Sequence, residues 1–127
     1  MSSFSDYLEN KVLDHVYRNV AYTAPTGTYL ALYTVAPTDA GGGTEVTGGG
    51  YARQTITFGA SSGGAIANTG AVAFTASGAA YGTVVAVGIF DAATLGNLLA
   101  WDAITSAVVG DGDTLNFPIG DIDVTLD

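Results

Sequence analysis

The sequence contains no cysteine, only three lysine and arginine residues, and a single histidine. Without cysteine, neither a disulfide framework nor a thiolate metal site can form. Twelve aspartate and glutamate residues give a formal net charge of −9, which repels nucleic acid and anionic membrane surfaces. Long apolar runs are also missing, because no stretch approaches the roughly 18 apolar residues that a membrane helix needs. We therefore expect no nucleic-acid partner and no membrane partner.

Charged residues are scarce as well: they make up 12% of the 127 residues, where a soluble domain has about 25%. A weakly charged surface is easily buried against other proteins. Eighteen glycines, about twice the usual share, raise the entropic cost of folding. Assembly into a symmetric oligomer could offset that cost. The length suits one domain, residues 1–127, and residues 1–11 lack signal-peptide character, so we expect synthesis in the cytoplasm.

A helix is predicted over residues 5–19. Ser3 or Ser5 can cap its start, acidic residues follow in the first turn, and Arg18 near the end complements the helix dipole. Apolar residues recur with the spacing of one helical face: Leu8, Val12, Leu13, Val16, Tyr17 and Val20. We expect this helix to pack on one end of the domain or to serve as a docking element.

Residues 28–127 predict strands and turns. Segments 28–34 (TYLALYT) and 51–58 (YARQTITF) each present two distinct faces. Further strands are expected at 71–76, 82–90, 96–101, 114–117 and 121–126, and in the last of these Ile122, Val124 and Leu126 face one way. Closely spaced turn signals separate the strands, with no helical pattern between them. The predicted fold class is mainly β: an antiparallel β-sandwich with one N-terminal α-helix and a long Gly-rich loop.

That loop, residues 38–50 (TDAGGGTEVTGGG), carries six glycines in two runs, and we call it the glycine arm. A phosphate cradle would lead into a helix through Lys-Ser or Lys-Thr, whereas this loop leads into a strand and has no lysine. We expect the glycine runs to act as hinges around residues 44–47, which become ordered on a neighbouring protein by strand addition. An exposed hairpin loop is the alternative. Arg53 is expected to anchor the base of the arm, through a carboxylate or an intermolecular contact.

Catalytic and metal-binding patterns are weak. His15 lies beside Asp14 in the predicted helix, where adjacent residues point in different directions, so we expect no enzyme activity and no cofactor. Asp111 and Asp113 flank a glycine as in a calcium loop, but the further ligands of such a loop are missing. An acidic β-turn is the simpler interpretation, and calcium between subunits stays an alternative. Trp101 ends an apolar strand and is expected in the core rather than on a carbohydrate-stacking platform.

Four segments carry a resemblance that covers nearly the whole chain: NKVLDHVYRNVAYTAP, TYLALYTVAPTDAGGGTEVTGGGYARQTITF, VGIFDAATLGNLLAW and GDTLNFPIGDIDVTLD. They are similar to a family of small structural proteins of tailed bacteriophages, whose members are described as tail-fibre-like, minor tail or head-decoration proteins. The resemblance implies a non-enzymatic virion component, on the exterior of the capsid or tail, and it brings no catalytic motif.

Within the virion, we expect a capsid decoration (cement) protein that stabilises the head. A tail adaptor, short fibre or baseplate component is the alternative, and a carbohydrate-binding module is a more remote one. The expected partners are further copies of the chain, in a homotrimer or another symmetric oligomer, and virion proteins such as the major capsid protein. A tail location would add a host surface glycan. The candidate interface residues are Gly41, Gly42, Gly43, Glu45, Gly48, Gly49, Gly50, Tyr51, Arg53, His15 and Arg18.

Overall fold

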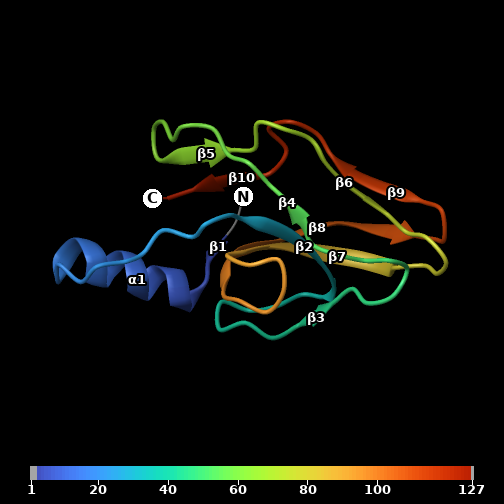
Figure 1. Ribbon diagram of the computed structural model, residues 1–127, viewed down its shortest axis with the longest axis horizontal. Helices are drawn as coiled ribbons and strands as arrows, with labels where there is room; N and C mark the ends of the chain where they lie inside the picture. The colour runs from blue at the N-terminus through green and yellow to red at the C-terminus, as the bar shows by residue number, and fades with distance from the viewer. Residues whose placement is uncertain (1–2, 127) are drawn as a thin grey trace.

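The computed structural model describes residues 3–126 as two β layers with one helix at the end of the molecule (Figure 1). The larger layer is an antiparallel sheet of six strands with the order β1-β8-β7-β2-β3, and β4 shares the outer edge of β2 with β3. Its strands are β1 (Ser3–Phe4), β2 (Tyr29–Val35), β3 (Thr44–Glu45), β4 (Gln54–Thr55), β7 (Gly82–Phe90) and β8 (Leu98–Val109).

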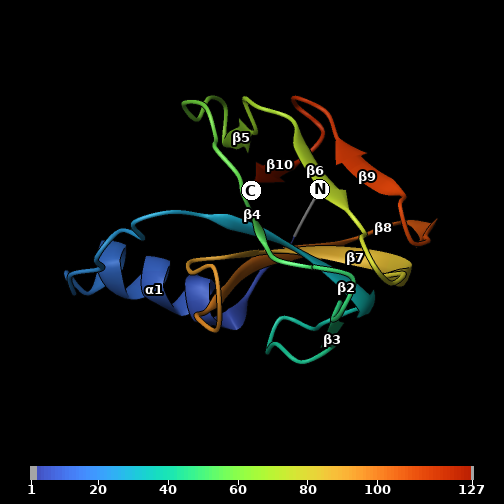
Figure 2. The same cartoon turned by 45° about the vertical axis from the view of Figure 1, so that its right-hand side comes forward.

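Two short antiparallel ribbons form the second layer. β5 (Ala65–Ala67) pairs with β10 (Asp123–Thr125), and β6 (Val72–Thr75) pairs with β9 (Thr114–Phe117). Figure 2 shows both ribbons on the same side of the large sheet. The predicted fold class, a mainly β antiparallel sandwich with a helix near the N-terminus, is confirmed.

The core lies between the two layers. Leu30 and Leu32 of β2 point into it with Val84 and Val87 of β7, and aromatic rings of the ribbons close it from the other side. Phe74 and Phe117, from β6 and β9, meet there edge to face at 6.3 Å between ring centres. The core therefore joins strands that are far apart in the sequence.

The opposite face of the large sheet is also apolar. Ala31 and Tyr33 alternate with the two leucines of β2 and cluster with Ala86, Phe90 and Leu98. Because a strand places successive side chains on opposite faces, β2 is buried on both. The glycine arm lies beside this second cluster, since residues 41–43 line a pocket together with Tyr33 and Phe90.

Helix α1 (Asp6–Tyr17) is tied to the sheet by its first residues. Ser5 is its N-cap: the Ser5 hydroxyl accepts a hydrogen bond from the Leu8 N–H at 3.2 Å and donates to the Leu98 carbonyl of β8. The helix ends at Tyr17, with Arg18 as its C-cap, and the next residue, Asn19, has a φ of 58°, a left-handed conformation that suits asparagine. No residue of the helix is buried, and Figure 1 shows it projecting from the sandwich. No helix within residues 3–126 has the length and apolar character that crossing a membrane requires.

The predicted element boundaries differ from the structure in a few places. Strand 51–58 is reduced to Gln54–Thr55, while the strand predicted over 96–101 continues to Val109 because its small and β-branched residues pair with the start of β7. The prediction that Leu126 shares the buried face of Ile122 is wrong, since Leu126 is 56% exposed. β10 ends at Thr125, but Leu126 still donates its N–H to the Gly64 carbonyl at 2.8 Å, so it lies at the end of the ribbon with its side chain mostly exposed.

Candidate functional site

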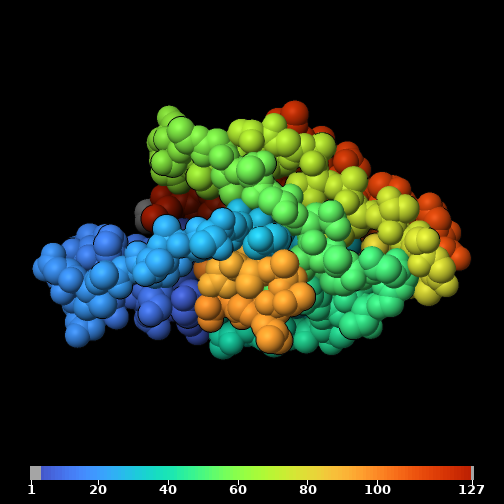
Figure 3. Space-filling model, viewed as in Figure 1, coloured from blue at the N-terminus to red at the C-terminus, as the bar shows by residue number. Residues whose placement is uncertain are grey.

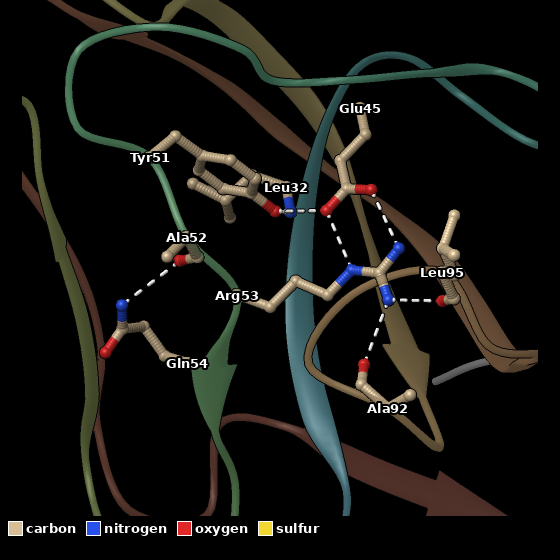
Figure 4. A network of polar contacts seen from close by, with 8 residues as sticks. All are labelled: Leu32, Glu45, Tyr51, Ala52, Arg53, Gln54, Ala92 and Leu95. Carbon is tan, nitrogen blue, oxygen red and sulfur yellow. Dashed lines mark hydrogen bonds and ion pairs between the residues drawn. The ribbon is translucent and has the colours of Figure 1, made fainter.

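Arg53 lies at the centre of a polar network between the glycine arm and the segment 91–97 (Figure 4). Its side chain is only 8% exposed. The Nε and Nη2 atoms donate to the two carboxylate oxygens of Glu45, both at 2.9 Å, which is the strong bidentate form of this pair. Nη1 donates to the carbonyls of Ala92 at 2.9 Å and Leu95 at 2.7 Å. The guanidinium also lies over the ring of Phe90, 3.6 Å from its centre.

Tyr51 connects this network to β2. Its hydroxyl donates to Glu45 Oε2 at 2.7 Å and accepts from the Leu32 N–H at 3.0 Å. Its ring packs within the main core, stacked against Phe74 and edge-on to Tyr81. Glu45, Tyr51 and Arg53 therefore hold β2, β3 and the segment 91–97 together, and we call these three residues the Arg53 hub.

The hub changes the acidity of its members. Burial raises the pKa of Tyr51 far above its ordinary value, and the Glu45 carboxylate at its hydroxyl raises it further. Burial alone would raise the pKa of Glu45, but the hydrogen bonds from Arg53 and Tyr51 and the charge of Arg53 outweigh it, so the pKa is lowered. Burial and the charge of Glu45 raise the pKa of Tyr33 to about 12. At neutral pH the hub therefore holds one anion, one cation and one neutral tyrosine, and Tyr33 beside it is neutral as well.

The glycine arm is folded onto its own sheet. All six of its glycines have positive φ, between 60° and 98°. A Cβ atom at Gly43 would lie 2.6 Å from the Val35 carbonyl oxygen, and one at Gly49 would lie 2.6 Å from that of Ala79. Between the two runs, β3 pairs with β2, and the buried Val46 donates its N–H to the Leu32 carbonyl at 2.9 Å. The glycines therefore form fixed turns, and residues 44–47 pair within the chain where the hinge hypothesis expected a free segment.

The predicted interface residues fall into two separate groups. Glu45, Tyr51 and Arg53 meet in the hub, with the glycines of the two turns beside them, of which Gly49 is buried and Gly41 half-buried. The Arg53 carboxylate pairing is confirmed. His15 and Arg18 lie instead on the exposed part of α1. There, His15 Nδ1 is 3.0 Å from the Val20 carbonyl oxygen and Arg18 forms an ion pair with Asp14 at 3.0 Å.

The sequence predicted the apolar stripe on α1 but not that its C-terminal part is exposed. The C-terminal members of the stripe lie in water: Leu13 is 53% exposed, Val16 58%, Tyr17 78% and Val20 44%. Only the first turns, through Tyr7 and Leu8, pack against the core. Of the two roles expected for the helix, this geometry favours the docking element.

Aspartates fill structural roles in the turns. The Asp111 carboxylate accepts from the Gly78 N–H at 2.9 Å and the Asp113 carboxylate from the Gly110 N–H at 2.8 Å, which suits the acidic β-turn interpretation.

Trp101 is half-buried against the second apolar cluster and donates its indole N–H to Asp39 at 2.9 Å. Among the residues described, exposed carboxylates of Asp6, Glu9 and Asp39 come within 4.8 Å of one another, beside the positive end of the α1 dipole.

A pocket of about 460 Å³ opens between the start of α1, the glycine arm and the turn before β8. Tyr33 and Phe90 form its apolar floor, and Asp39 and Glu45 are among its polar walls. Figure 3 shows the segment 91–97, in orange, filling the surface between the chain that follows α1 and the glycine arm. The arrangement gives a rigid, acidic surface with a projecting helix.

Comparison with known proteins identifies the family. Residues 3–125 match the family described as podophage GP4 fiber I protein gp80. The chain belongs to this family. The family match confirms the predicted resemblance to small phage structural proteins. The chain is therefore a structural protein of a phage fibre family, which makes it a virion component. A search of the curated proteins found no match. A cement role on the capsid finds no support in the family match.

The glycine turns generate a first prediction. Gly42→Ala and Gly43→Ala both place a side chain at positive φ, at 80° and 74°, but only the second meets backbone within 3 Å. We expect Gly42→Ala to cost about 1 kcal/mol of unfolding free energy and Gly43→Ala at least about 1–2 kcal/mol more. Urea unfolding measures both. Equal losses would show that the arm is not held against β2.

The hub generates a second prediction, on pH. Because the pKa of Glu45 is lowered from its model-compound value of 4.5, its stabilising contribution is complete above about pH 4.5 and is lost as pH falls through the folded-state pKa. At pH 7, Glu45→Gln should reduce the unfolding free energy by roughly 2–4 kcal/mol, since it leaves Arg53 buried without its anion.

This difference from the unsubstituted protein should shrink as pH falls below 4.5, and chemical denaturation at a series of pH values checks it. Glu9→Gln changes the other glutamate, which is exposed on α1, and serves as the control, with a loss of less than about 1 kcal/mol. A Glu45→Gln deficit that stays constant from pH 7 to pH 3 would contradict the assignment.

Proposed function

We propose that this protein is a non-enzymatic fibre subunit of a podophage tail, which attaches to other virion proteins through α1. The observation that carries the proposal is the match of residues 3–125 to the fiber I family. It supports the tail alternative over the capsid cement role that the sequence alone favoured.

The surface chemistry is consistent with a fibre subunit. Such a protein needs a stable fold, a contact with its neighbours and an inert remaining surface. The Arg53 hub provides rigidity at the loops, α1 presents apolar side chains to a neighbour, and the low charged fraction of 12% leaves much of the surface compatible with burial. None of these features requires a reaction centre.

Quantitative mass spectrometry of purified particles tests the proposal. Heads and tails are separated, and this chain is counted against the major capsid protein as internal standard. We expect a few to a few dozen copies per particle, all in the tail fraction. Copies in near-equal number to the major capsid protein, in the head fraction, would overturn the fibre role in favour of capsid decoration. Absence from both fractions would overturn the virion role.

A further inference from the structure

The pocket between the start of α1 and the glycine arm contains a buried polar group without a partner. Tyr33, on β2, lines this pocket and is only 3% exposed. Buried polar groups normally have a hydrogen-bond partner, yet the Tyr33 hydroxyl has none among residues 3–126. The hydroxyl groups of Tyr51 and Tyr81, in contrast, donate to Glu45 and to a backbone carbonyl. The Tyr33 hydroxyl therefore marks a position where a ligand can supply the missing hydrogen bond.

The charged walls of this pocket, which we call the acidic pocket, are all of one sign. The carboxylates of Asp6, Asp39 and Glu45 line it, and within the part of the chain that the structure describes no lysine, arginine or histidine does. Asp39 accepts the Trp101 indole N–H through Oδ1, which leaves its second oxygen available to a ligand. The net charge of −9 adds to the negative potential. The acidic pocket is therefore suited to a cation.

The helix N-terminus beside the acidic pocket does not reverse this preference. A helix N-terminus binds anions through its free N–H groups. Here, the Asp6 N–H donates to the Asp39 carbonyl at 2.8 Å, and the Leu8 N–H donates to the Ser5 hydroxyl at 3.2 Å. The carboxylates of Asp6 and Glu9, in the first turn, already complement the helix dipole. An anion would find few donors and several like charges.

The floor of the acidic pocket is apolar. The buried side chains of Phe90 and Leu98 line it beside the ring of Tyr33. A volume of about 460 Å³ suits an organic ligand. Hard metal ions take oxygen ligands and gain nothing from such a floor. An alkyl stem, in contrast, packs on apolar surface while the charged group at its end stays among polar partners.

We propose that the acidic pocket binds an organic cation, which is an ammonium or guanidinium group on an apolar stem. The cation donates charge-assisted hydrogen bonds to Asp39 and to the oxygen of the Tyr33 hydroxyl, and the stem lies on Phe90. Such a group belongs either to a free amine or to a basic side chain of a neighbouring protein, and the chemistry is the same. The inference goes beyond the proposed function and does not depend on it, since it concerns the isolated protein.

Nuclear magnetic resonance of the full chain tests the proposal, through ¹H–¹⁵N correlation spectra at pH 7 and low ionic strength. Trp101 is the single tryptophan of the chain, and its indole N–H is bonded to Asp39, so its signal reports on the acidic pocket. The probes are cadaverine, a free diamine, and the peptide acetyl-Gly-Lys-Gly-amide. We expect a saturable shift of the indole signal, with the Gly78 and Gly110 amides unchanged.

The two probes distinguish the sources of the cation. Tighter binding of cadaverine indicates a free amine, and tighter binding of the peptide indicates a protein side chain. The same peptide with an acetylated lysine has no charge and should cause no shift. The proposal would be overturned if neither probe gave a saturable shift up to about 10 mM. It would also be overturned if calcium chloride shifted the indole signal and the amines did not, because the pocket would then be a metal site.

Tyr33→Phe separates binding from folding. The substitution removes a hydroxyl that has no partner in the free protein, so the urea midpoint should stay the same or rise. The affinity for the better probe should fall about tenfold, as loss of a hydrogen bond to a charged group does. Tyr81→Phe is the matched control: it loses a bond to the Thr75 carbonyl, so it should lower the midpoint and leave the affinity unchanged. The reverse pattern would contradict the proposal.

Asp39→Asn tests the charge of the acidic pocket. The asparagine keeps an oxygen for the Trp101 indole but loses the negative charge, so the affinity should fall about tenfold or more. Asp111→Asn makes the same change of net charge in the turn beside Gly78 and should leave the affinity within about twofold. Equal losses in the two variants would overturn the proposal, since the amines would then respond to the overall charge and not to this pocket.

Discussion

The ion pair between Arg53 and Glu45 is the interaction on which the surface architecture depends. One guanidinium engages a carboxylate, two carbonyls and an aromatic ring, so it fixes the glycine arm and the segment 91–97 at once. A buried pair of this kind is costly to desolvate, and removing either partner leaves the other charge buried without compensation. Here, it keeps two long loops in one arrangement above the second apolar face of the sheet.

Local patterns in the sequence predicted much of the fold. The Ser5 cap, the helix, and the strands at 82–90 and 114–117 follow from capping chemistry and side-chain periodicity, which act over short distances. The pairing of Arg53 with a carboxylate could also be predicted from the sequence. The conformation of the glycine arm could not, because it depends on contacts with Val35 and Ala79 that no local pattern reveals.

The rigid loops and the projecting helix have different functional meanings. The glycine runs first suggested an arm that reaches another protein, yet its central residues already pair with β2. The unsatisfied surface lies instead on α1, where apolar side chains remain in water. The chain belongs to a phage fibre family, and only the first turns of α1 pack against the sandwich.

Hydrogen–deuterium exchange of Arg53→Met, compared with the unsubstituted protein, tests the central claim that one ion pair organises both loops. Methionine retains an apolar stem without the guanidinium. The account predicts faster exchange at two distant amides together, that of Val46, bonded to Leu32, and that of Asp91, bonded to Asn97, with the β7 and β8 amides unchanged. Exchange at both amides that equals that of the unsubstituted protein would contradict it.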